Sequence, residues 1–230
     1  MHVVVNAATS VDGKLSSRER RQVAISGDDD FDRVDALRAD SDAVLVGVGT
    51  VLADDPSLTV KRDERVAARE SRGESPQPVR VVVDSRARTP PDAAVVDDRA
   101  QTYVLASAEA PGDRRARLTS DTTEVVVVDA DDDGRVDLAA GLAALDGRGV
   151  DSVMVEGGGE LIFSLFAADL VDELSVYVGS MVVGGRDAPT LADGDGFTTP
   201  DFVDLDLRDV TRVDDGVLLA YDVTGGSSER

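Results

Sequence analysis

Residues 47–61 read GVGTVLADDPSLTVK and directly follow the apolar run AVLV at residues 43–46. Four consecutive apolar residues indicate a buried strand. Two glycines, a hydroxyl, paired carboxylates and the turn-forming Pro56 come next, so polar groups are concentrated where the strand ends. This segment is typical of a nucleotide-handling enzyme.

The chain is acidic throughout its length. It has 230 residues, with 24 Lys and Arg against 46 Asp and Glu, and a net charge of −22. This charge argues against nucleic acid and anionic membranes as partners. Only Lys14 and Lys61 are lysines and aromatic residues are scarce. We therefore expect a halophilic protein, whose surface repulsion high salt would screen.

The lack of cysteine and the single histidine exclude several kinds of site. Thiolate nucleophiles, disulfides and Cys-based metal sites are impossible without cysteine, and redox chemistry needs a cofactor. His2 alone cannot build a multi-His metal site, and we expect no metal. No apolar run approaches the roughly 20 residues of a membrane-spanning helix, and no signal pattern opens the chain, so we expect a cytoplasmic protein.

Alternating strand and helix patterns predict an α/β fold. Helical spacing of apolar residues occurs at 31–37, 138–145 and 161–166. Short apolar runs predict strands at residues 3–5, 43–46, 79–83, 102–105, 125–128 and 153–155. Strands flanked by helices indicate a mainly parallel central sheet with helices on both faces.

The C-terminal part predicts antiparallel strands. Residues 202–213 and 217–223 alternate around the hairpin signal DDG. We expect residues 1–224 to form a single domain and residues 225–230 a disordered tail. Residues 61–78 are charged and rich in proline at their end, which predicts a surface loop or disordered insertion. The apolar stretch 174–183 could pair across a dimer or form an internal strand.

Four segments carry candidate chemistry. Residues 6–14 combine small residues with an Asp-Gly turn. Thr50 lies at the predicted start of a short helix. Asp84-Ser85-Arg86 follow a predicted strand. Arg pairs with phosphate bidentately, which suits an adenosine 2′-phosphate. Glu156 and three glycines stand between a strand and a helix, an arrangement suited to a pyrophosphate, although the spacing is not that of a Rossmann motif.

The segments NAATSVDGK, VGVGTVLADDPSLTV, VVVDSR, VEGGGELI and LVDELSVYVGSMVVGGRDAPT together resemble the riboflavin-biosynthesis reductases of dihydrofolate-reductase-like fold. The chain is most similar to the stand-alone archaeal and fungal type, the 2,5-diamino-6-ribosylamino-pyrimidinone 5′-phosphate reductases. Bacterial relatives carry the reductase behind a zinc deaminase domain, whose usual zinc ligands a chain without cysteine cannot supply. The resemblance implies reduction before deamination, in a homodimer, with NADPH as cofactor and NADH as a second donor.

The resemblance also implies roles for individual residues. Substrate would contact Asn6, Ser10, Leu58, Lys61 and Glu156, and Glu156 and Asp12 would be the catalytic residues. Lys61 and Arg62 both remain candidates for the substrate phosphate. The implied cofactor contacts are Ala8, Thr50, Asp54, Asp84, Ser85, Arg86, Ala87, Gly157, Gly158, Gly159 and Glu160.

The implied reaction is hydride transfer from the nicotinamide to C1′ of the ring-opened imine of the substrate sugar. Positioning of the two reactants could supply most of the acceleration. Three alternatives stay open. They are a reductase of the deaminated uracil compound, a dihydrofolate-reductase-like enzyme, and a non-catalytic nucleotide-binding module.

Overall fold

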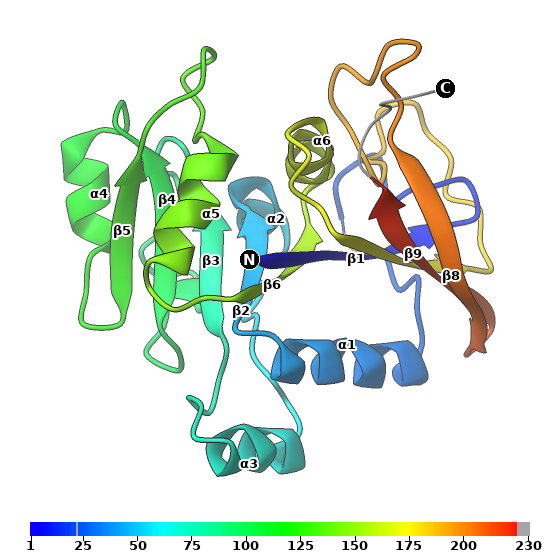
Figure 1. The fold of residues 1–230 in the computed structure, drawn as a ribbon, viewed down its shortest axis with the longest axis horizontal. Coiled ribbons are helices and arrows are strands. Elements are labelled where there is room, and N and C mark those ends of the chain that lie inside the picture. Colours follow the sequence, from blue (N-terminus) through cyan, green and yellow to red (C-terminus); the bar gives the residue numbers. More distant parts are fainter. Residues whose placement is uncertain (22, 225–230) are drawn as a thin grey trace. The chain divides into compact units, whose positions relative to one another are not determined.

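A computed structural model describes residues 1–21 and 23–224, which form two compact units (Figure 1). The first unit consists of Met1 and Val34–Met154. The second combines His2–Arg33 with the described chain from Val155 onward. The tail predicted at residues 225–230 lies outside the described residues.

The first unit contains a parallel sheet in the order β5-β4-β3-β2. Its strands are β2 (Ala43–Gly47), β3 (Val79–Val83), β4 (Thr102–Ser107) and β5 (Thr123–Val128). Its helices are α2 (Val48–Asp54), α3 (Asp63–Ser71), α4 (Gly112–Leu118), α5 (Leu138–Asp146) and the 3₁₀ turn η1 (Ala94–Val96). The predicted parallel strands are confirmed here.

Helices cover both faces of this sheet. Val104 and Ala106 of β4 pack with Leu118 of α4 on one face. Leu105 points the opposite way, because strand side chains alternate, and its Cδ1 lies 3.1 Å from where a Cβ on Gly141 of α5 would stand. Both α4 and α5 contact β5 (Figure 1). The double covering explains why these strands read as continuous apolar runs.

The second unit combines parallel and antiparallel pairing. Strand β1 pairs with β7 in parallel, whereas β7 with β9 and β9 with β8 are antiparallel. Strand β6 and helix α1 cross between the two units along the chain. The elements are β1 (His2–Ser10), α1 (Asp28–Asp40), β6 (Ser152–Gly157), α6 (Gly159–Ala167), β7 (Glu173–Gly179), β8 (Asp204–Val213) and β9 (Gly216–Thr224). The predicted antiparallel C-terminal strands are confirmed.

The hairpin turn between β8 and β9 caps helix α1. The carboxylate of Asp214 accepts hydrogen bonds from the backbone N–H groups of Asp29 (3.2 Å) and Asp30 (3.1 Å). These amides lie in the first turn of the helix, where no intrahelical acceptor exists. A Cβ on Gly27 would stand 2.6 Å from Cγ of Asp214, so glycine is needed there. The predicted turn therefore also stabilises a helix that begins about 185 residues earlier in the chain.

The prediction of a loop at residues 61–78 is wrong, because α3 occupies half of it. The helix is anchored by arginine instead of by an apolar stripe. Arg69 is 3% exposed and donates to the carbonyls of Ala39, Ser41 and Ser75, each at 2.9 Å. Its side chain is buried, its hydrogen bonds go to these backbone oxygens, and its Nη1 also forms an ion pair with Glu74 at 3.4 Å. Hydrophobic periodicity does not detect such an arrangement.

Two strands bear on association with other molecules. Residues 174–179 of the stretch 174–183 lie in β7, an internal strand between β1 and β9, so the internal-strand alternative is correct for them. Strand β8 is exposed along almost its whole length and carries Leu205, Leu207 and Val210 at the surface. No helix within the described residues is long and apolar enough to cross a membrane.

Candidate functional site

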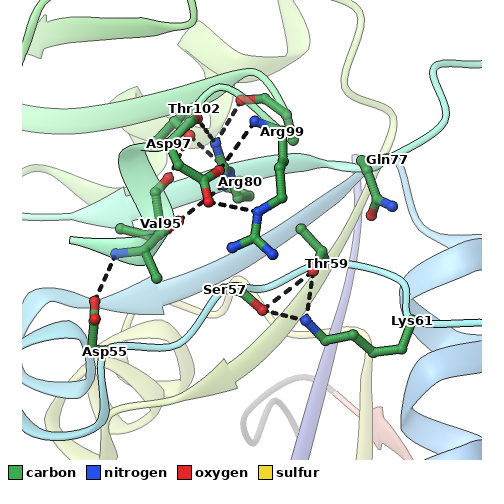
Figure 2. A network of polar contacts seen from close by, with 12 residues as sticks. Asp55, Ser57, Thr59, Lys61, Gln77, Arg80, Val95, Asp97, Arg99 and Thr102 are labelled. Atoms are coloured by element: carbon green, nitrogen blue, oxygen red, sulfur yellow. Dashed lines mark hydrogen bonds and ion pairs between the residues drawn. The ribbon is translucent and has the colours of Figure 1, made fainter. Parts of the chain in front are cut away.

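Lys61 forms a compact polar cluster with two hydroxyl groups in the first unit. Its Nζ donates to Ser57 Oγ at 2.5 Å and to Thr59 Oγ1 at 2.8 Å, and the two hydroxyl oxygens lie 3.2 Å apart. Figure 2 shows the Lys61 side chain folded back toward both hydroxyls. An ammonium group has three N–H donors, so one remains for a bound anion.

Leu58 explains why the two hydroxyls face the same way. Its side chain is 1% exposed and packs in the core with Val44, Val46 and Val82, so only its backbone could contact substrate. Its φ of 50° lies in the left-handed region, which is strained for a leucine. The buried side chain thus holds the loop that presents Ser57 and Thr59.

Charged groups surround the Lys61 cluster. Arg38 Nη1 donates to the carbonyl of Thr59 at 3.1 Å, and Asp35 accepts from the backbone N–H of Lys61 at 2.6 Å. Burial lowers the pKa of the Lys61 ammonium, and the positive charges of Arg38 and Arg99 lower it further, whereas Asp35 opposes them. An anion placed here would relieve the repulsion among the cations.

Thr50 and Asp54 both lie on α2, which follows β2 directly. Thr50 is half-buried in the first turn, and Asp54 is the last residue of the helix. Partial burial raises the pKa of the Asp54 carboxyl. The neighbouring Asp55 has a structural contact instead, accepting from the backbone N–H of Ala94 at 2.7 Å (Figure 2).

The side chains of Asp84 and Ser85 hold their own loop. Asp84 is completely buried, and its Oδ2 accepts from the backbone N–H (2.6 Å) and hydroxyl (2.8 Å) of Thr89. Ser85 Oγ accepts from the backbone N–H of Val136 at 2.9 Å. Arg86 is exposed. Any contact that Asp84 and Ser85 make to a cofactor would therefore come through the backbone of this turn.

A pocket of about 310 Å³ opens beside this turn. Apolar residues and three arginines line it, and Arg88, Arg114 and Arg117 were not predicted from sequence because they come from two separate segments. Apolar walls with a cluster of arginines suit a phosphorylated ring system. The lining residues are Ala87, Arg88, Thr89, Pro90, Pro91, Arg114, Arg117 and Leu118.

The triple-glycine turn lies in the second unit, between β6 and α6. Gly157 and Gly158 have φ values of 154° and 96°, which residues with a Cβ rarely adopt. A Cβ on Gly159 would stand 2.8 Å from Asp193 Oδ2 and closer still to the carbonyl of Thr190. No side chain caps α6, so its first N–H groups are suited to an anion. Glu160 is exposed in the first turn of the helix.

The end of β1 brings together two other predicted residues in the second unit, Ser10 and Asp12. Ser10 donates to Asp12 Oδ1 at 2.7 Å, and Asp12 also accepts from the backbone N–H groups of Val183 (3.0 Å) and Gly184 (2.8 Å). The Ser10 contact and these amides lower the pKa of Asp12 to about 2. An ionised Asp12 orders this loop and is unsuited to donating a proton near neutral pH.

Asn6 and Ala8 also lie on β1, and Glu156 on β6. Asn6 is buried, and its Oδ1 accepts from Arg33 Nη2 at 2.8 Å, which fixes its orientation because arginine can only donate. Ala8 and Glu156 are half-buried. Arg33 was not predicted as part of this group, because the helical spacing of apolar residues at 31–37 says nothing about the polar residues between them.

Comparison with known proteins identifies the family. The RibD C-terminal domain family matches residues 1–219. The 2,5-diamino-6-ribosylamino-4(3H)-pyrimidinone 5′-phosphate reductase of Archaeoglobus fulgidus is 48% identical, over 85% of this chain and 88% of that protein. The enzyme of the same name from Methanothermobacter thermautotrophicus is 42% identical, over 97% and 99%. A pyrimidine reductase-like protein from Corynebacterium diphtheriae has the same fold, with a TM-score of 0.81, 18% identity and coverage of 97% and 92%. The chain therefore belongs to the family of RibD C-terminal domains.

Proposed function

We propose that this chain reduces 2,5-diamino-6-(5-phosphoribosylamino)pyrimidin-4(3H)-one to its ribitylamino product, with NADPH as the reductant, in riboflavin biosynthesis. The observation that carries the proposal is the identity of 48% and 42% to two reductases named for this substrate, over most of the chain. The hydroxyl and ammonium groups at Lys61 add support, because the substrate carries a phosphate.

The phosphate of the substrate is assigned to Lys61, Ser57 and Thr59. Lys61 is preferred to Arg62 because its ammonium group already lies against two hydroxyls. Arg62 instead precedes α3, and its backbone N–H donates to Asp35 at 3.2 Å. A compact ammonium point charge suits a phosphate that also accepts from hydroxyls.

The residues present fit the dinucleotide cofactor. The positive φ angles of Gly157 and Gly158 and the uncapped start of α6 suit its pyrophosphate. The pocket beside Ala87, with Arg88, Arg114 and Arg117, suits an adenosine 2′-phosphate and hence NADPH. When bound, NADPH supplies the hydride.

The predicted side chains of the second unit, apart from Glu156, position other groups and do not donate protons. Asp12 is ionised and holds Val183 and Gly184, while Asn6 is oriented by Arg33. The ring-opened imine of the substrate is electrophilic at C1′, so hydride addition needs positioning above all. Glu156 is the assigned proton donor to the imine nitrogen, with water as the other source.

We also propose that the enzyme is a homodimer. Strand β8 presents Leu205, Leu207 and Val210 to solvent, with exposures of 37%, 56% and 56%. A long edge strand with exposed apolar side chains is normally covered by a partner. A second copy of the chain is the occupant that the proposal assigns.

One assay tests the activity. NADPH absorbance is followed in concentrated salt with the diamino substrate and with its deaminated uracil counterpart in parallel. Faster oxidation with the diamino compound is expected. Preference for the uracil compound would assign the chain to the bacterial type of reaction, and NADPH binding without oxidation by either substrate would overturn the enzyme proposal.

A further inference from the structure

Arg80 of β3 is a completely buried arginine whose five N–H donors are all used. Its Nε donates to Thr102 Oγ1 at 2.9 Å, and its Nη1 donates to the carbonyl of Ala94 at 3.2 Å and to Asp97 Oδ1 at 2.7 Å. Its Nη2 donates to the carbonyls of Asp97 (2.5 Å) and Ala100 (2.6 Å). One side chain therefore fixes the whole connection from η1 to β4.

The same connection carries Arg99, which Asp97 holds in place. The Oδ1 of Asp97 accepts from the Arg99 backbone N–H at 3.1 Å, and its Oδ2 accepts from Arg99 Nε at 2.6 Å. Asp97 thus bridges the buried Arg80 and the half-exposed Arg99. Because Arg80 already neutralises Asp97, the charge of Arg99 is not needed to pair that carboxylate.

The guanidinium group of Arg99 is directed toward the Lys61 cluster. Figure 2 shows it between Asp97 and the hydroxyls of Ser57 and Thr59. Within residues 1–21 and 23–224, its two terminal nitrogens make no hydrogen bond or ion pair. The positive charge of Arg99 also lowers the pKa of Lys61, which indicates that the two cations are close.

Two neighbouring cations with N–H donors to spare are suited to binding an anion. In a chain of net charge −22, attraction to carboxylates is easily arranged, yet Arg99 and Lys61 are placed where they repel each other. Asp35 nearby is already paired with Arg65 at 3.0 Å. A phosphate would accept from the free donors of Lys61 and Arg99 and remove their repulsion.

We propose that Arg99 is the second cation of the substrate phosphate site, and that Arg80 is a positioning residue acting on it through Asp97. The proposal rests on the assignment of the substrate phosphate to Lys61. Arg99 supplies two terminal N–H groups in the planar arrangement that fits two phosphate oxygens. The chemical group recognised is a sugar 5-phosphate.

The kinetic test compares Arg99→Gln with Arg148→Gln. Arg148 is a matched control, because it also pairs with a carboxylate, Glu124, at 2.6 Å and lies in the same unit. Arg99→Gln should raise the KM for the phosphorylated pyrimidine about 10- to 100-fold, leave the KM for NADPH unchanged and change kcat less than about threefold. Arg99→Lys should recover part of the loss. An unchanged substrate KM in Arg99→Gln would overturn the proposal while leaving the proposed activity intact.

The positioning role is tested with Asp97→Asn, since replacing the buried Arg80 could unfold the chain. Asp97→Asn should raise the substrate KM, and adding it to Arg99→Gln should raise KM no further, because both changes remove the same contact. Additive effects on KM would show that Asp97 acts independently of Arg99 and would overturn that part of the proposal.

A binding test separates this inference from the activity. Calorimetric titration with ribose 5-phosphate should show binding that Arg99→Gln and Lys61→Gln weaken and Arg148→Gln does not. The lysine signals give a second readout, because ¹³C-lysine labelling reports only Lys14 and Lys61. The pKa of Lys61 should be higher in Arg99→Gln than in the wild-type protein, because the repulsion from Arg99 is lost. The other charges that act on Lys61, those of Arg38, Asp35 and Asp97, are unchanged in this variant. Failure of ribose 5-phosphate to bind the wild-type protein would overturn the inference whatever pyrimidine is reduced.

Discussion

Replacing Gly159 by alanine should weaken NADPH binding and lower stability. The added Cβ would stand 2.8 Å from Asp193 Oδ2 and closer to the carbonyl of Thr190, whereas ordinary contacts begin near 3.4 Å. The loop that holds these atoms must therefore retreat by more than half an ångström, or the first turn of α6 must shift. Either movement disturbs the backbone N–H groups assigned to the pyrophosphate.

The loop has little freedom to retreat. The backbone N–H of Asp193 donates to the carbonyl of Gly159 at 3.0 Å, and the Asp193 carboxylate accepts from the backbone N–H (3.0 Å) and hydroxyl (2.5 Å) of Thr190. Overpacking of this kind costs about 1–3 kcal/mol. If all the strain falls on the cofactor complex, NADPH affinity decreases about 5- to 150-fold. If it falls on the fold, the melting temperature decreases by about 2–4 °C for each kcal/mol.

NADPH affinity is measured by fluorescence titration and melting temperature by calorimetry. The loss of binding free energy and the loss of stability should together reach about 1–3 kcal/mol. Gly147→Ala is the control, because Gly147 has a φ of −61° and its Cβ would meet the nearest atom, the Ala143 carbonyl oxygen, at an ordinary 3.6 Å. Wild-type affinity and melting temperature in Gly159→Ala would refute the reasoning, because the loop would then not constrain the turn.

Four further predictions concern the cofactor pocket, the β1 loop, association and salt. The double change Arg114→Gln and Arg117→Gln should raise the KM for NADPH about tenfold and leave that for NADH unchanged, since only NADPH has the 2′-phosphate; equal effects would count against the pocket. The NMR signals of the Val183 and Gly184 amides should shift with a midpoint near pH 2. The pKa of Asp12 is lowered from 3.8 to about 2, so the carboxylate keeps its hydrogen bonds above pH 3.8 and loses them as pH falls through 2. An NMR midpoint near 3.8 would contradict this. Leu207→Lys should give a monomer in light scattering where the wild-type chain gives the proposed dimer, and a monomeric wild-type chain would refute the dimer. Melting temperature should rise between about 0.1 and 1 M KCl as the Debye length falls from about 10 to 3 Å, and a flat profile would refute a halophilic surface.

The strands were predictable because each is a β-branched apolar run between polar segments. The run at residues 79–83 is buried on both faces in β3, whereas the run at 125–128 forms the edge strand β5, where Val127 is 44% exposed. Helix α3 was not predictable in this way, because Arg69 replaces the apolar anchor and its partners are backbone carbonyls on distant segments. Hydrophobic periodicity can be recognised in a sequence, whereas a guanidinium group buried against main-chain oxygens leaves no such pattern.

The candidate site shows a similar division. Lys61 could be singled out from the sequence as one of two lysines. The close approach of Ser57 and Thr59 could not, because it occurs around the left-handed backbone of Leu58 and not in a strand. Arg99 could not be found this way. It follows Lys61 by 38 positions and reaches the cluster through contacts of Arg80 and Asp97, which depend on how β3 and β4 pair.

The discontinuous second unit has a consequence for the order of events during synthesis. Residues 34–154 emerge from the ribosome as a complete unit, and domains generally fold as units from the N-terminus. The opening segment through Arg33 must wait, because β1 pairs with β7 and the first turn of α1 has its cap, Asp214, in the last hairpin. The first strand to be made is thus among the last to be paired, and its pairing with β7 waits until the C-terminal part of the chain has been synthesised.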